Sequence, residues 1–190
     1  MIDTSGHHLV YGELQDYLTG EILPDTDDER IRQSLARILV EQLGYSKEEL
    51  EPRLIIDSCF NNNQTRTLIE LTARINGQRL FILRYGPGSL VTRETAAVAA
   101  ARILDPAYRI PLAIVTNGRD AELLETDKGT VLAFGMASIP DRLQAEKMVR
   151  EYAFEPYNDP ERRDKALRIL NVFDQEVCCH GSDCTQEGTT

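Results

Sequence analysis

Long apolar runs and an amino-terminal export signal are both missing from this 190-residue sequence. No apolar segment approaches the roughly 18 residues that a membrane-spanning helix needs. Residues 1–10 contain no basic region followed by an apolar one, which a secretory signal peptide requires. The sequence therefore predicts a protein with no membrane partner, and the cytoplasm is its expected location.

The sequence motifs of nucleotide-driven motor proteins are missing as well. The chain contains neither a P-loop nor a G-x-G-x-x-G motif, and it has no internal repeat or low-complexity segment. Its length suits one domain with a proper core and is short for two. The sequence therefore excludes a helicase or translocase motor within these residues.

Cysteine is scarce, with four residues, and in the cytoplasm thiols are expected to be reduced. Cys178, Cys179 and Cys184 cluster near the carboxyl end, and Cys59 is the only other cysteine. Adjacent cysteines chelate poorly, and this spacing departs from the C-x₂-C pattern of zinc sites. Reduced or redox-labile thiols are therefore favoured over a structural zinc site that would need Cys59 as a fourth ligand.

Basic residues are outnumbered, giving a formal charge of −10, but their distribution is uneven. Residues 66–102 hold six bases, all arginine, against two glutamates, while residues 1–51 and 103–190 are acidic. Arginine forms bidentate hydrogen bonds with phosphate and carboxylate groups. Association with a polyanion depends on the local electrostatic field more than on the total charge. The central segment is either a nucleic-acid-binding surface or a set of scattered surface arginines.

The segment 66–89 organises the predicted fold. Residues 68–75 alternate with a two-residue period, which indicates a strand, and Asn76-Gly77 forms the commonest tight hairpin turn. The second strand, residues 80–83, is continuously apolar and so is expected to be covered on both faces. It ends in Arg84-Tyr85-Gly86-Pro87-Gly88, which is either a binding loop or a simple connection.

Other elements follow from periodicity, caps and turns. Helices are expected between a cap at residues 25–27 and Gly44, over 91–104, from about 140 to 152, and over 159–174. Strands are expected over 52–60, 110–116, 121–125 and 130–134. This order predicts an α/β fold with a mixed sheet between helical layers. The expected organisation is an amino-terminal extension (1–24), one domain (25–175) and a cysteine-containing tail (176–190).

Several of these motifs resemble a known family. The run Asp25-Thr26-x-x-Glu29-Arg30-x-Arg32-Gln33, followed by Leu39-Val40-Glu41-x-x-Gly44-Tyr45, is similar to the opening helix of the N-terminal nuclease domain of type I restriction enzyme R subunits. The Asn76-Gly77 hairpin and the later Val115-Thr116-Asn117-Gly118 match further elements of that domain. The resemblance covers roughly residues 25–135 and implies a three-layer restriction-endonuclease-like (PD-(D/E)XK) fold in a bacterial protein.

The resemblance also implies catalytic chemistry that this sequence lacks in part. In that family an acid on the first hairpin strand and an E-x-K pair on the second bind Mg²⁺ and activate water. The first acid matches Glu70, but Arg84 and Gly86 stand in place of the E-x-K pair. Since a guanidinium repels Mg²⁺, Arg84 either forms an ion pair with Glu70 in place of the metal, or both side chains point to water at an exposed end of the sheet. Glu29 is a second candidate acid, although its place in the first helical turn favours a role in capping.

Two interpretations therefore stay open. In the first, the domain is a pseudo-nuclease that binds DNA or another protein, with Arg84, Tyr85, Arg66 and Arg93 as nucleic-acid contacts. In the second, it is an active Mg²⁺-dependent DNA endonuclease whose ligands have moved to Glu70, Glu29 or Asp57. DNA and other restriction-system subunits are the partners that the resemblance implies.

Overall fold

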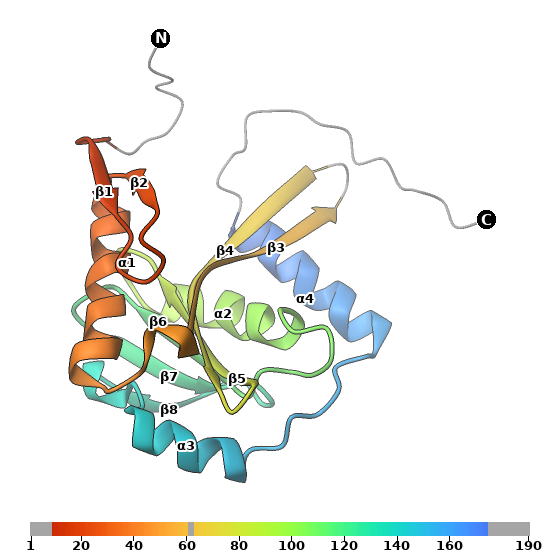
Figure 1. The fold of residues 1–190 in the computed structure, drawn as a ribbon. Helices are drawn as coiled ribbons and strands as arrows, with labels where there is room; N and C mark the ends of the chain where they lie inside the picture. Colours follow the sequence, from red (N-terminus) through yellow and green to blue (C-terminus); the bar gives the residue numbers. More distant parts are fainter. Residues whose placement is uncertain (1–8, 61–62, 175–190) are drawn as a thin grey trace.

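A six-stranded mixed sheet forms the centre of the computed structural model, which describes residues 9–60 and 63–174 (Figure 1). Its strands are β3 (Leu50–Phe60), β4 (Asn63–Ile75), β5 (Gln78–Tyr85), β6 (Leu112–Thr116), β7 (Ala121–Glu125) and β8 (Thr130–Phe134). They lie in chain order, and every neighbouring pair is antiparallel except β5 and β6, which are parallel. The parallel pair is joined by the helix α2 (Val91–Ile103).

The central hairpin, β4–β5, has the predicted Asn76-Gly77 turn. Both turn residues have positive φ, 52° and 83° respectively, which asparagine and glycine tolerate best. A β-bulge between Ala73 and Arg74 then shifts the register by one residue and places Leu71 opposite Leu83. The recorded pairing of the two strands ends at Leu71 and Leu83, so Glu70 and Arg84 are the next residues toward the open end of the hairpin.

Helices cover both faces of the sheet. The helices α1 (Asp27–Arg37) and α3 (Arg142–Glu151) pack on one face, where Leu35 and Val149 are buried in one core cluster with apolar residues of β4, β5 and β6. On the other face, α2 and α4 (Pro160–Phe173) lie side by side over a second core cluster. The predicted three-layer α/β fold is confirmed, as is the double coverage of β5, whose residues 80–83 are completely buried.

Local sequence signals explain where the helices begin. The Thr26 hydroxyl accepts the Glu29 N–H and caps α1, Asp141 forms a capping box with Gln144 at α3, and Asp159 precedes Pro160 at α4. After α1 the chain continues as a π-helical turn, η1 (Ile38–Gln42), and a short 3-10 helix, η2 (Lys47–Glu49), leads into β3. A third short helix, η3 (Met136–Ser138), follows β8.

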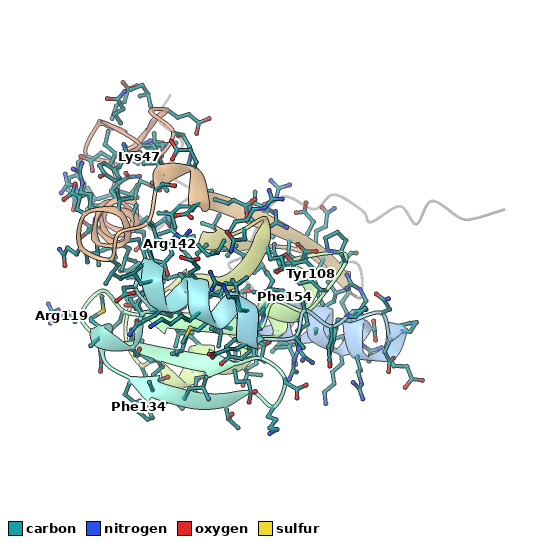
Figure 2. All side chains as sticks on the ribbon, turned by 60° about the horizontal axis from the view of Figure 1, so that its bottom comes forward. Lys47, Tyr108, Arg119, Phe134, Arg142 and Phe154 are labelled. Atoms are coloured by element: carbon teal, nitrogen blue, oxygen red, sulfur yellow. The ribbon has the colours of Figure 1, made fainter. Side chains whose placement is uncertain are left out.

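Long-range contacts fix the helix α3 and the segments that connect it to the rest of the fold. Arg142 at the start of α3 donates to Glu49 at 2.7 Å, which ties α3 to η2. Tyr108 and Phe154, labelled in Figure 2, pack edge to face with ring centroids 5.1 Å apart. The Tyr108 hydroxyl also accepts the Arg79 N–H, so this pair anchors the chain after α3 beside the turn of the central hairpin.

A small hairpin precedes the sheet. The strands β1 (Glu13–Gln15) and β2 (Ile22–Pro24) pair antiparallel, and Tyr17 and Leu18 between them pack against the core on the α1 side. The proposed boundaries at residues 24 and 175 stay predictions. No described helix is long and apolar enough to cross a membrane.

Candidate functional site

A cavity of about 410 Å³ opens at the point where β4 and β5 meet the start of α1, the start of α2 and the end of α4. Charged side chains of both signs line it: Asp28, Arg32, Arg66, Glu70, Arg84, Arg93 and Asp174. Tyr85, Gly86 and Pro87 contribute the loop that leaves β5. We call this space the arginine cavity. The structure thus brings together Glu70 and all four predicted nucleic-acid contacts.

Glu70 is a buried carboxylate within a cationic shell. Its side chain is 5% exposed, its Oε2 accepts the Tyr85 N–H at 3.1 Å, and its Oε1 lies 3.9 Å from Arg32 Nε. Burial raises the pKa of Glu70 above its ordinary 4.5, and the positive charges of Arg84 and Arg32 oppose that rise. The carboxylate is therefore held by cations and a backbone donor, with burial favouring its neutral form.

Arg84 pairs with Asp174, so the predicted Glu70–Arg84 ion pair is wrong as a direct contact. Its Nη1 and Nη2 donate to the two carboxylate oxygens of Asp174 at 3.1 and 3.0 Å. Asp174 follows the last residue of α4 and also accepts the Thr67 hydroxyl at 2.8 Å. A bidentate fork is geometrically preferred by guanidinium, and it leaves Arg84 acting on Glu70 only through its charge.

Arg93 occupies the space beside Gly86. A Cβ built on Gly86 would lie 2.0 Å from Arg93 Cζ, which is far inside van der Waals contact. The Arg93 guanidinium also donates from Nη2 to the Pro87 carbonyl at 3.2 Å. The position that the resemblance assigns to a lysine therefore has no side chain of its own, yet a cation from α2 fills that place.

Glu29 is buried and hydrogen-bonded in addition to lying in the first turn of α1. Its carboxylate accepts Arg32 Nη1 at 3.0 Å and Gln33 Nε2 at 2.8 Å, while Thr26 provides the cap. It retains the favourable position of an acid in the first helical turn. Because Arg32 contacts both Glu29 and Glu70, a guanidinium lies between the two acids that were candidate metal ligands.

A second network supports α1 from behind the arginine cavity. Asp16 is buried, pairs with Arg53 and accepts Gln33 Nε2 and the Leu18 and Thr19 N–H groups. Burial alone would raise the pKa of Asp16, but these hydrogen bonds outweigh it and hold the pKa at about 2. Arg53 has a φ of 53°, which is unusual for a residue other than glycine. This network fixes Gln33 and, through it, the Glu29 carboxylate.

The predicted metal ligands do not converge. Within residues 9–60 and 63–174, no group of three histidine, cysteine, aspartate or glutamate side chains is placed to hold a metal ion. Asp57 is largely exposed and pairs with Arg66 at 2.9 Å. Mg²⁺ prefers an octahedral set of oxygen ligands, whereas Arg32 and Arg84 surround the Glu70 carboxylate. The donor set of this cavity therefore does not fit Mg²⁺.

The proposed zinc ligands are only partly within the described residues. Cys59 on β3 is disulfide-bonded, so its sulfur is not a thiolate ligand for zinc. Cys178, Cys179 and Cys184 lie outside the described residues.

The raised pKa of Glu70 predicts a pH-dependent contribution to stability. Because folding favours the protonated carboxyl, its contribution is most favourable below pH 4.5 and declines as pH rises through the raised value. We expect the variant Glu70→Gln to lack this decline. The difference between its free energy of unfolding and that of the native chain should therefore change in favour of the variant as pH rises from 4 to 8. Urea unfolding across that range measures the difference, and parallel profiles would contradict the expectation.

Of the charged cavity residues that sequence reasoning missed, Arg32 and Asp174 were missed for different reasons. Arg32 lies three residues after Glu29 and hence on the same side of the helix, a local signal that does not by itself indicate contact with Glu70. Asp174 lies 90 residues after Arg84, and no local pattern links it to the hairpin. Its role follows only from the packing of α4 on the sheet.

Comparison with known proteins agrees with this architecture. Residues 27–140 match the family model described as type I restriction enzyme R protein N terminus. Comparisons with curated proteins and with solved structures gave no match. The matched segment runs from the first residue of α1 to just before α3 and contains β3 to β8. The chain therefore belongs to the family of type I restriction enzyme R protein N-terminal domains.

Proposed function

We propose that this chain is a DNA-binding accessory domain of a restriction system that does not itself hydrolyse DNA. The observation that carries the proposal is the gathering of four arginines, Arg32, Arg66, Arg84 and Arg93, around one cavity. Two of them, Arg84 and Arg93, stand where the family's nuclease chemistry would require a carboxylate and a lysine. DNA and the other subunits of such a system are the partners we expect.

The cavity suits a phosphate group in three respects. The four arginines outnumber the three acids that line it, and burial favours the neutral form of one of those acids, Glu70. The Nε–H groups of Arg32, Arg84 and Arg93 are buried without a hydrogen-bond acceptor among the described residues. Such donors are costly when unpaired, so an incoming phosphate oxygen would relieve that cost.

The net charge of the chain limits how DNA is bound. A total of −10 repels a polyanion at long range, while the local arginines attract it at short range. We therefore expect binding that is confined to a few phosphates, with a salt slope that rises by about one for each phosphate neutralised, since each releases a counterion.

Fluorescence anisotropy with a short labelled duplex tests the proposal. The variant Arg93→Ala should weaken binding about 3- to 10-fold and reduce the salt slope by about one, as expected for one lost phosphate contact. Arg150→Ala is the matched control and should leave affinity unchanged, because this exposed arginine of α3 pairs with Glu146 and does not line the arginine cavity. Equal affinities for Arg93→Ala and the native chain would overturn the proposal.

Gly86→Ala probes the same contact without removing a charge. The added methyl group would collide with the Arg93 guanidinium, a flexible end that can move aside. We therefore expect a stability change within about 1 kcal/mol and a loss of DNA affinity similar to that of Arg93→Ala. Urea unfolding and anisotropy measure the two effects, and a variant with unaltered affinity would show that the position of Arg93 is unimportant.

Plasmid incubation with Mg²⁺ or Mn²⁺ tests the alternative, an active endonuclease with relocated ligands. We expect no nicking above that of the variant Glu70→Ala. Nicking that disappears in Glu70→Ala would establish the alternative and refute catalytic silence. None of the contacts of Glu70, Glu29 or Asp57 favours it.

A further inference from the structure

A second basic cavity, of about 380 Å³, lies at the opposite end of the α2–α4 layer from the arginine cavity. It is formed by the end of α2, the start of α4 and the turn between β7 and β8. Arg93 lies in the first turn of α2 and Arg102 in its last, so about 13 Å of helix separates the two cavities along α2. We call the second space the distal cavity.

The distal cavity has an excess of positive charge. Arg102, Arg109, Arg162 and Lys165 line it together with a single carboxylate, that of Asp127. Four cations against one acid is unexpected in a chain whose formal charge is −10. A concave surface lined by one sign of charge concentrates its field and attracts a counter-ion.

Backbone oxygens hold Arg102 in place. Its Nε donates to the Thr126 carbonyl at 2.7 Å and its Nη2 to the Asp127 carbonyl at 2.8 Å. Among the residues that the structure describes, no carboxylate forms an ion pair with Arg102. The guanidinium is thus oriented by neutral acceptors and keeps its full charge for the cavity.

Arg109 forms the second fixed cation. Its side chain is 13% exposed, and its Nη1 pairs with Asp127 at 2.7 Å. Its Nη2 lies 3.7 Å from Glu155, which is largely exposed. The Nε–H of Arg109 is buried and has no acceptor within the described part of the chain. An unpaired buried donor beside a cationic cavity indicates a place where an external acceptor would be stabilised.

Exposed cations and an apolar wall complete the cavity. Arg162 and Lys165 project from the first turns of α4 and are exposed, and Arg162 Nε lies 3.4 Å from the carboxylate of Asp159 at the helix N-cap. Tyr157 and Ile169 supply a half-buried aromatic and aliphatic surface. Two guanidiniums oriented by hydrogen bonds and two exposed cations match a compact anion of several oxygens, and the volume is within the usual range for small-molecule sites.

We propose that the distal cavity is a phosphate-binding site, separate from the arginine cavity, that takes a pyrophosphate-sized anion. Arg102 and Arg109 bind the anion and Lys165 and Arg162 close over it, while Tyr157 packs against any ring that the phosphates carry. The same chemistry is offered by a free nucleoside diphosphate and by the phosphorylated end of a nucleic-acid strand.

Isothermal titration of the full chain with inorganic pyrophosphate at low salt tests the site. The double variant Arg162→Glu/Lys165→Glu reverses two exposed charges, so it should fold normally and lose at least 10-fold in affinity. Lys147 is an exposed lysine of α3, outside the distal cavity. The variant Lys147→Glu is therefore the matched control for charge reversal at a lysine and should bind pyrophosphate like the native chain. The Arg109 Nε–H resonance should shift on saturation.

A further variant distinguishes binding in the distal cavity from binding in the arginine cavity. Arg93→Ala should leave pyrophosphate binding in the distal cavity intact, even if it abolishes DNA binding. Absence of pyrophosphate binding, equal affinity in the double variant, or binding lost only in Arg93→Ala would each overturn the proposal. Further titrations use a nucleoside diphosphate, a 5′-phosphorylated oligonucleotide and its 5′-hydroxyl counterpart. The ligand that binds more tightly than pyrophosphate identifies the source of the phosphate.

Discussion

The substitution Asp174→Ala is expected to lower the free energy of unfolding by about 3 kcal/mol, because it leaves the buried Arg84 guanidinium without its carboxylate. The side chains of Arg84 and Asp174 are only 12% and 14% exposed, so water replaces little of the lost interaction. The Thr67 hydroxyl loses its acceptor in the same variant. Urea unfolding monitored by circular dichroism measures the change.

A neighbouring ion pair on the same helix provides the control for this prediction. Asp164 and Arg168 pair at 2.7 Å, but both side chains are more than half exposed. Exposed pairs contribute about 0–1 kcal/mol, so Asp164→Ala should have a small effect. The double variant Arg84→Ala/Asp174→Ala should be less destabilised than the sum of its single variants. Strict additivity would show that the fork contributes nothing.

Charge reversal at position 84 is expected to have a larger effect and to create a dependence on Mg²⁺. In Arg84→Glu the new carboxylate would face Asp174 and lie near Glu70, so three acids would gather where two are now balanced by a cation. In EDTA the loss should exceed that of Asp174→Ala, because repulsion is added to the broken pair. Mg²⁺ at 100 times its dissociation constant should restore about 2.7 kcal/mol.

The isosteric comparison for charge reversal is Arg84→Gln, which breaks the pair but offers no additional carboxylate. We expect its thermal midpoint, and that of the native chain, to be the same in EDTA and in Mg²⁺. Differential scanning fluorimetry gives all three comparisons in one experiment. Stabilisation of the native chain by Mg²⁺ to the same extent would mean that Arg84 does not exclude the metal.

Local sequence patterns predicted most of the fold. The two-residue period of residues 68–75, the Asn76-Gly77 turn and the alanine-rich α2 are all short-range signals, and each element appears where it was expected. The strands β7 and β8 have the predicted bounds because a turn with Gly129 separates two short apolar segments. These elements depend on residues that are close in sequence.

The candidate site was predicted only in part, since its contacts are long-range. The residues Glu70, Arg84 and Arg93 were identified, but their partners were not. The bulge at Ala73 changes which residues face each other, and nothing in the sequence of the strand marks it. The filling of the space beside Gly86 by Arg93 depends on how α2 packs after the loop, a relation that only tertiary structure supplies.

The bidentate ion pair between Arg84 and Asp174 has a consequence for the order in which the chain folds during its synthesis on the ribosome. Asp174 lies beyond residue 140, where the match to the family ends, and it is synthesised long after β5. A nascent chain that has completed all six strands still lacks the anion that neutralises Arg84. The sheet can therefore assemble early, but the arginine cavity reaches its final electrostatic state only when α4 docks.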